Sequence, residues 1–153
     1  MTPATSDRAL LNIVLVEDDD AEAKAVRRAF DRARIANSIV RVTDGVEARR
    51  LLHGEAETPP PDSFVLLVDL NMPRMGGIEL LQEIRRAPRL TGTVAFVMTT
   101  SDDERDRVAA YRQHAAGYIV KQNAGTDFMN LVSAIDHYWR IVELPELRQF
   151  AGA

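Results

Sequence analysis

Cysteine is absent from the 153-residue sequence, which excludes disulfides, thiolate nucleophiles, iron–sulfur clusters and cysteine zinc sites. An excess of basic residues is also missing, since 19 lysines and arginines stand against 23 aspartates and glutamates, for a net charge of −4. Because binding to a phosphate backbone needs clustered positive charge, we expect no nucleic-acid partner. The chemistry of any site must therefore use oxygen and nitrogen atoms.

Long apolar segments are missing as well. The longest apolar runs, such as residues 64–68 and 94–98, are far too short to span a bilayer. The first residues, MTPATSDRALLN, lack the basic-then-apolar order of a signal peptide. From the sequence we therefore expect a cytoplasmic location and no membrane partner.

What is present is the composition of one globular domain, with 46% hydrophobic and 27% charged residues. Short aliphatic runs alternate with longer segments of helical periodicity, which predicts five strand–helix units. Strands are expected at residues 12–16, 39–42, 64–69, 94–99 and 117–120, and helices at residues 20–33, 45–52, 77–86, 103–113 and 126–139. Because parallel strands are buried on both faces, the near-continuous apolar runs predict a central parallel sheet in a doubly wound α/β fold.

Acidic residues follow the first expected strand, at the edge of such a sheet where ligands bind. The run is Glu17, Asp18, Asp19 and Asp20, where a nucleotide-binding relative would place glycines and hydroxyls. Oxygen ligands in this number favour a hard cation such as Mg²⁺. A simpler interpretation is that acidic residues stabilise the start of the next helix through its dipole.

Three more polar groups stand at later strand ends. Asp69 ends the third strand, Thr99 the fourth, and Lys121 follows the fifth. Each has an ordinary explanation alone, as a turn residue, a strand former or a solvated strand end. Because the carboxyl ends of parallel strands share one edge, we expect them to converge with the acidic run into a phosphoryl site.

These residues belong to motifs that closely resemble the receiver domain of two-component response regulators, over roughly residues 10–140. The motifs are NIVLVEDD at residues 12–19, VDLNMPRMGG at 68–77, MTTS at 98–101 and GYIVK at 117–121. The resemblance implies a flavodoxin-like sheet of strand order 2-1-3-4-5 with five helices. Residues 1–9 are then an N-terminal tail and residues 141–153 a C-terminal extension.

The resemblance also implies roles for individual residues. Asp69 is expected to accept a phosphoryl group, with Lys121 as the counter-charge to the phosphoryl oxygens. Thr99 and Tyr118 are expected to form the switch pair that reports phosphorylation. The residues expected to hold Mg²⁺ are Glu17, Asp18, Asp69 and, through its backbone carbonyl, Asn71.

Two positions lie beyond the phosphoacceptor and the switch threonine. Asn71 and Ser101, each two residues further on, flank the path of the attacking water in such folds. We expect them to tune the rate of dephosphorylation. The protein would then be no enzyme in the usual sense, since it catalyses only its own phosphorylation and dephosphorylation.

Finer details resemble the stand-alone receivers that work with bacterial phytochromes. These are the run TTSD at residues 99–102, the pair Tyr138-Trp139, and Leu144-Pro145 after the last helix. The implied partner is a sensor histidine kinase of the bacteriophytochrome type. Lys121 is followed by Gln122, whereas most receivers have a cis proline at that position.

An apolar C-terminal extension follows the five complete units. Its members are Ile141, Val142, Leu144, Leu147 and Phe150. We expect a homodimer through the fourth helix, the fifth strand and the fifth helix, reinforced by this extension. The alternative is that the extension folds back on its own last helix.

Three other functions are alternatives to a receiver domain. A flavin or nucleotide-binding domain would share the topology, but the acidic loop contradicts it. A phosphatase of the haloacid dehalogenase type also uses an aspartate nucleophile with Mg²⁺, yet Asn71 stands where its second acid would be. A receiver-like scaffold without phosphorylation is the third, and the complete set of acid, hydroxyl and lysine disfavours it.

Overall fold

A computed structural model describes residues 10–125 and 128–144, so the expected tail at 1–9 and most of the extension lie outside the described residues. All strand pairs are parallel, and the sheet has the order β2-β1-β3-β4-β5. The strands are β1 (Leu11–Val16), β2 (Asn37–Val42), β3 (Val65–Val68), β4 (Val94–Thr99) and β5 (Gly117–Val120). The predicted fold class and strand order are therefore confirmed.

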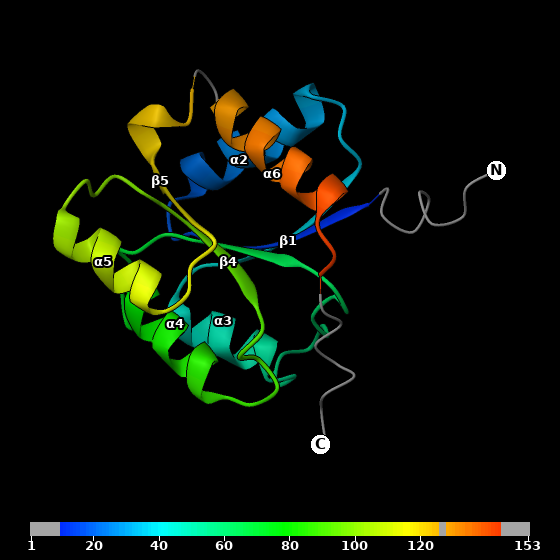
Figure 1. The fold of residues 1–153 in the computed structure, drawn as a ribbon. Helices are drawn as coiled ribbons and strands as arrows, with labels where there is room; N and C mark the ends of the chain where they lie inside the picture. The colour runs from blue at the N-terminus through cyan, green and yellow to red at the C-terminus, as the bar shows by residue number, and fades with distance from the viewer. Residues whose placement is uncertain (1–9, 126–127, 145–153) are drawn as a thin grey trace.

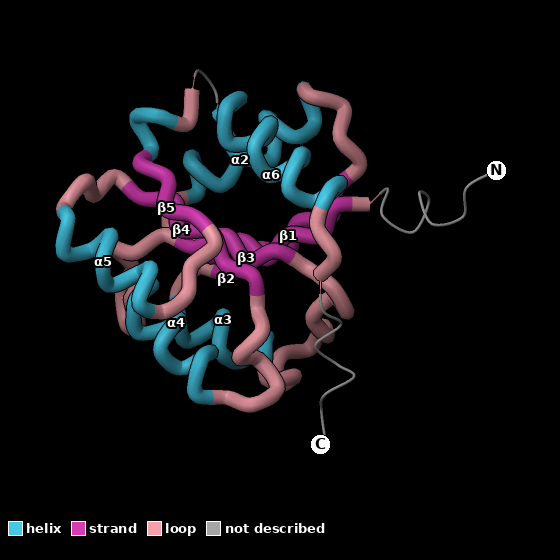
Figure 2. Tube along the Cα trace, in the orientation of Figure 1, coloured by secondary structure: helices cyan, strands magenta, loops and turns pink. Residues whose placement is uncertain are grey.

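Helices cover both faces of the sheet, as Figures 1 and 2 show. On one face lie α2 (Asp20–Arg32) and α6 (Met129–Ile141). On the other lie α3 (Gly45–Leu52), α4 (Gly77–Arg86) and α5 (Glu104–Arg112). This is the doubly wound arrangement, in which each helix runs back to the edge where the next strand begins.

Side chains that alternate along the central strands divide the core in two. Val14 and Val16 of β1 pack in a first core cluster with α3 and α4, whereas Ile13 and Leu15 pack in a second core cluster with α2 and α6. Every residue of β3 is fully buried. The strand ends that carry polar groups are therefore anchored in a rigid, closely packed layer.

Aspartates cap three of the helices that begin at the carboxyl edge of the sheet. Asp19 accepts a hydrogen bond from the Glu22 N–H (3.0 Å), and Asp44 accepts one from the Glu47 N–H (2.9 Å). Asp103 does the same at the start of α5. The simpler interpretation of the acidic run is thus correct for Asp19, whose carboxylate satisfies the helix terminus.

The element bounds differ from the predicted ones mainly at the ends of the last units. A short 3₁₀ turn, η1 (Lys121–Asn123), follows β5 where no helix was expected. The last helix runs to Ile141, two residues beyond the predicted end, because Trp139 is buried and Arg140 pairs with Asp136 at 3.0 Å. No cis peptide bond occurs among the described residues.

Leu144, in the extension, packs against the second core cluster of its own chain. For this residue the contact agrees with the alternative expectation, in which the extension folds back on its own chain. Ile141 remains 77% exposed. Leu147 and Phe150 lie outside the described residues. In the part of the chain that is described, helices long and apolar enough to cross a membrane are not found.

Candidate functional site

The backbone pairing of the sheet continues one residue past β1 and β3, and this places the first two acids. The Glu17 N–H donates to the Val42 carbonyl at 3.0 Å, and the Asp69 N–H donates to the Val16 carbonyl at 3.1 Å. Both residues are consequently held by the sheet rather than by a free loop. Both residues are almost completely buried, with exposed fractions of 1% for Glu17 and 8% for Asp69.

Glu17, Asp18 and Asp69 form a group that fits a cation. One carboxylate oxygen from each lies within 4.8 Å of the others, and Asp18 is exposed to solvent. All three donors are oxygen atoms, which suits a hard ion such as Mg²⁺ better than zinc or copper. The Asn71 N–H donates to Asp69 Oδ1 at 3.2 Å, so the loop after β3 closes around the same carboxylate.

Lys121 is the cationic centre of the site. Its Nζ lies 3.1 Å from Glu17 Oε1 and 3.2 Å from Asp69 Oδ2, and it also donates to Glu22 on α2. The side chain is only 9% exposed. Burial alone would lower the pKa of Lys121, but the hydrogen bond with Glu22 and the charges of Asp69 and Glu17 raise it above its usual value. These acidic partners therefore favour the charged form of the ammonium group.

Burial raises the pKa of Glu17 to about 8, and the neighbouring charge of Asp69 adds to the rise. The ammonium of Lys121 acts in the opposite direction and only partly compensates. Two carboxylates beside one ammonium leave an excess of negative charge in a buried place. A divalent cation would remove that excess, which is a second reason why the acidic group fits one.

Thr99 and Tyr118 are each hydrogen-bonded to the backbone of Ser101. The Ser101 N–H donates to Thr99 Oγ1 at 3.3 Å, and the Tyr118 hydroxyl donates to the Ser101 carbonyl at 2.9 Å. Thr99 is completely buried, whereas Tyr118 is half-buried against the first core cluster. The guanidinium of Arg107 lies 5.7 Å from the centre of the Tyr118 ring. Burial raises the pKa of Tyr118, so its hydroxyl remains a donor.

Three residues near the site were not predicted from the sequence. Arg41 of β2 donates to the Glu17 carbonyl at 2.9 Å and to Asp20 at 2.6 Å, which gives Asp20 a structural role. Arg107 covers the Tyr118 ring, and Glu22 contacts Lys121. Glu22 lies in the first turn of α2, and no spacing in the sequence signalled its contact with a residue 99 positions away.

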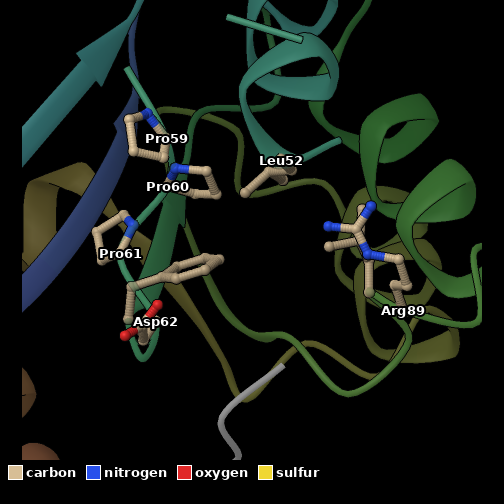
Figure 3. A pocket seen from close by; sticks show the side chains of 8 residues that line it. Leu52, Pro59, Pro60, Pro61, Asp62 and Arg89 are labelled. Atoms are coloured by element: carbon tan, nitrogen blue, oxygen red, sulfur yellow. The ribbon is translucent and has the colours of Figure 1, made fainter. Parts of the chain in front are cut away.

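A separate cavity lies at the opposite edge of the sheet (Figure 3). The proline-rich loop before β3 forms one wall, with Pro59, Pro60 and Pro61 beside Phe64, and the cavity measures about 110 Å³. Phe64 directly precedes β3, whereas the acidic group follows the strand ends. This cavity is therefore not part of the site built by Glu17, Asp69 and Lys121.

Comparison with known proteins agrees with this geometry. Residues 13–133 match the family described as the response regulator receiver domain. The response regulator Rcp1 of Synechocystis sp. is 35% identical over 136 residues, which are 87% of this chain and 92% of that protein.

Two solved structures are similar in both fold and sequence. One is the phosphorylated cyanobacterial phytochrome response regulator RcpA, with a TM-score of 0.78 and 32% identity over 90% of this chain and 99% of that one. The other is the Mn²⁺-bound form of Rcp1, with a TM-score of 0.77 and 32% identity over 88% of this chain and 99% of that one.

The raised pKa of Glu17 predicts a pH-dependent gain in stability when its charge is removed. In metal-free buffer containing EDTA, Glu17→Gln should have a larger free energy of unfolding than the wild type. Unfolded Glu17 loses its proton near its ordinary pKa of 4.5 and folded Glu17 near 8, so the gain should grow between these values and then level off. We expect roughly 1–3 kcal/mol at pH 9, measured by urea unfolding.

Glu55→Gln serves as the control, because Glu55 is an exposed glutamate in the loop after α3. It should show no such pH dependence. A Glu17→Gln gain that is equal at pH 5 and pH 9 would contradict the assignment.

Proposed function

The chain belongs to the response regulator receiver domain family, and we propose that it is a response regulator whose Asp69 accepts a phosphoryl group from a sensor histidine kinase. The proposal rests on one observation, which is that Lys121 Nζ lies within 3.2 Å of both Asp69 and Glu17 at the strand ends. Nucleotide-binding domains and phosphatases of the haloacid dehalogenase type belong to other families, so the family match disfavours both alternatives. A non-phosphorylated scaffold is the remaining alternative, and the experiment on Asp69 tests it.

Transfer from a phosphohistidine requires little covalent assistance from the protein. An Asp69 oxygen attacks phosphorus, the N–P bond of the donor breaks, and its electron pair returns to the imidazole nitrogen. Lys121 offers N–H donors to the phosphoryl oxygens. A Mg²⁺ ion held by Glu17, Asp18, Asp69 and the Asn71 carbonyl would neutralise phosphoryl charge when bound.

The readout is proposed to pass through Ser101. Once a phosphoryl group is on Asp69, the Thr99 hydroxyl, which already accepts from the Ser101 N–H, can donate its own proton to a phosphoryl oxygen. A shift of Thr99 toward that oxygen would draw the Ser101 backbone with it. Because Tyr118 is bonded to the Ser101 carbonyl, a movement of this loop changes the position of the tyrosine ring. Asn71 and Ser101 remain the residues proposed to tune dephosphorylation.

A bacteriophytochrome is the kinase we propose as partner. This rests on the similarity to RcpA and Rcp1, of which RcpA is described as a phytochrome response regulator. Signalling would then proceed by the conformational switch and by contact with other proteins. The cytoplasmic location expected from the sequence stays a prediction.

Asp69→Asn should abolish phosphorylation, because an amide is a poor nucleophile. Among the described residues, Glu17 and Asp69 are the two strand-end acids that contact Lys121, and Glu17 is expected to bind the metal instead. The assay is labelling by acetyl phosphate, and by a phytochrome kinase, in the presence of Mg²⁺. Asp31→Asn, an exposed acid at the far end of α2, is the matched control and should be labelled like the wild type. Acid-labile label that persists on Asp69→Asn would contradict the assignment.

Asp18→Ala should lower Mg²⁺ affinity by at least about tenfold, since it removes a directly coordinating oxygen. Glu17→Gln should have the smaller effect if Glu17 acts through water. Isothermal titration with Mg²⁺ measures both, and Asp20→Asn controls for the loss of one nearby charge, because Asp20 pairs with Arg41 instead. Equal Mg²⁺ affinity in the wild type and Asp18→Ala would refute this role.

We also infer a homodimer through α5, β5 and α6. Large apolar side chains exposed on these two helices support it. They are Val108 and Tyr111 on α5, and Met129 and Ile141 on α6. Leu10 is the one other exposed large apolar residue among those described. Burying such side chains on a second copy contributes on the order of 1.5–3 kcal/mol for each fully buried one, before the cost of association.

Val108→Glu should convert the dimer to a monomer at tens of micromolar, because it places a charge in the proposed interface. Light scattering measures the mass. Leu10→Glu makes the same change at an exposed apolar residue outside these helices and should leave the dimer intact. A chain ending at Leu144 retains that residue's packing and tests the remaining extension. A wild-type mass of one chain would refute the dimer.

A further inference from the structure

We propose that Glu22 competes with the phosphoryl group for Lys121 and so sets how readily the acceptor site is occupied. This inference rests on the proposed function of Asp69. Its basis is the contact between the Glu22 carboxylate and Lys121 Nζ, which joins the first turn of α2 to the end of β5.

Lys121 has no donor to spare. An ammonium group carries three N–H donors. In this structure its Nζ contacts three carboxylates, those of Glu17, Asp69 and Glu22. The lysine side chain is 9% exposed, so few water molecules can exchange for these partners. A newly arrived anion must therefore take the place of one of them.

The three carboxylates differ in what else they do. Asp69 is the acceptor itself, and Glu17 belongs to the group that fits a cation. Among the described residues that group comprises Glu17, Asp18 and Asp69, so Glu22 lies outside it. Glu22 is also the most accessible of Lys121's three partners, with 32% of its side chain exposed. It is consequently the partner that can be released into solvent at the lowest cost.

Phosphorylation moves negative charge outward from Asp69 onto the phosphoryl oxygens. Lys121, still bonded to the Glu22 carboxylate on α2, must then divide its N–H donors between that carboxylate and the phosphoryl oxygens. The Glu22 carboxylate also repels that anion directly. Both effects act in the same direction, so the charge of Glu22 weakens binding of a phosphoryl group and favours the unphosphorylated state.

The opposite role is physically reasonable and makes the proposal testable. Glu22 could instead hold Lys121 in the position needed to meet the phosphoryl oxygens. In that case, removal of the carboxylate would weaken binding of a phosphoryl mimic. Competition predicts that removal strengthens it.

The experiment measures the affinity of beryllofluoride, a mimic of the phosphoryl group, at saturating Mg²⁺. Glu22→Gln and Glu22→Ala should bind it about fivefold more tightly than the wild type, since a partly exposed ion pair is worth about 1 kcal/mol. Glu22→Asp retains a carboxylate and should return the affinity to within about twofold of the wild type. Equal or weaker binding by the Gln and Ala variants overturns the proposal.

Asp20→Asn is the matched control. It removes the same charge from the same helical turn, but Asp20 pairs with Arg41 and does not contact Lys121. An equal gain in this variant would assign the effect to general charge and overturn the specific role of Glu22. The Glu22 backbone N–H donates to the side chain of the cap residue Asp19, and all three Glu22 variants keep this donor. Thermal unfolding checks that they fold.

The failure of this inference can be distinguished from failure of the proposed function. If wild-type protein binds beryllofluoride and is labelled on Asp69 while the Glu22 variants behave like the wild type, only the competition is refuted. If the wild type does neither, the acceptor function fails and the competition fails with it.

Discussion

The balance of charge around Lys121 is the constraint on which the site depends. One buried ammonium stands among the carboxylates of Glu17, Asp69 and Glu22. Without the lysine, the two acids at the ends of β1 and β3 would repel each other in a place that solvent hardly reaches. The parallel sheet brings these groups together, and their mutual compensation allows the sheet edge to stay closely packed.

The charges around Lys121 do not cancel, because the acidic groups outnumber the single ammonium. The raised pKa of Glu17 reports the excess, because a proton is retained where a cation would otherwise be favourable. The same excess of negative charge supports the proposal that a divalent cation binds beside Asp69.

Much of the fold was predictable from the sequence, because buried parallel strands and amphipathic helices leave clear periodic patterns. The strand ends then located Asp69, Thr99 and Lys121 correctly at one edge. The contact of Glu22 with Lys121 was not predicted, since it joins residues 99 positions apart through the reach of two flexible side chains. Periodicity describes each element alone and carries no information about such contacts. The turn η1 after β5 was missed for a similar reason, since three residues are too few to show a period.

The aspartate caps at the starts of α2, α3 and α5 also bear on the charge balance of the site. Asp19, Asp44 and Asp103 follow strands β1, β2 and β4, so they surround the same edge as the acidic group. Asp44 and Asp103 are each paired with an arginine, Arg74 and Arg105, so two of the three caps add little net charge at this edge. The caps therefore fix the starts of three helices around the acidic group with little increase in the negative charge that Lys121 must balance.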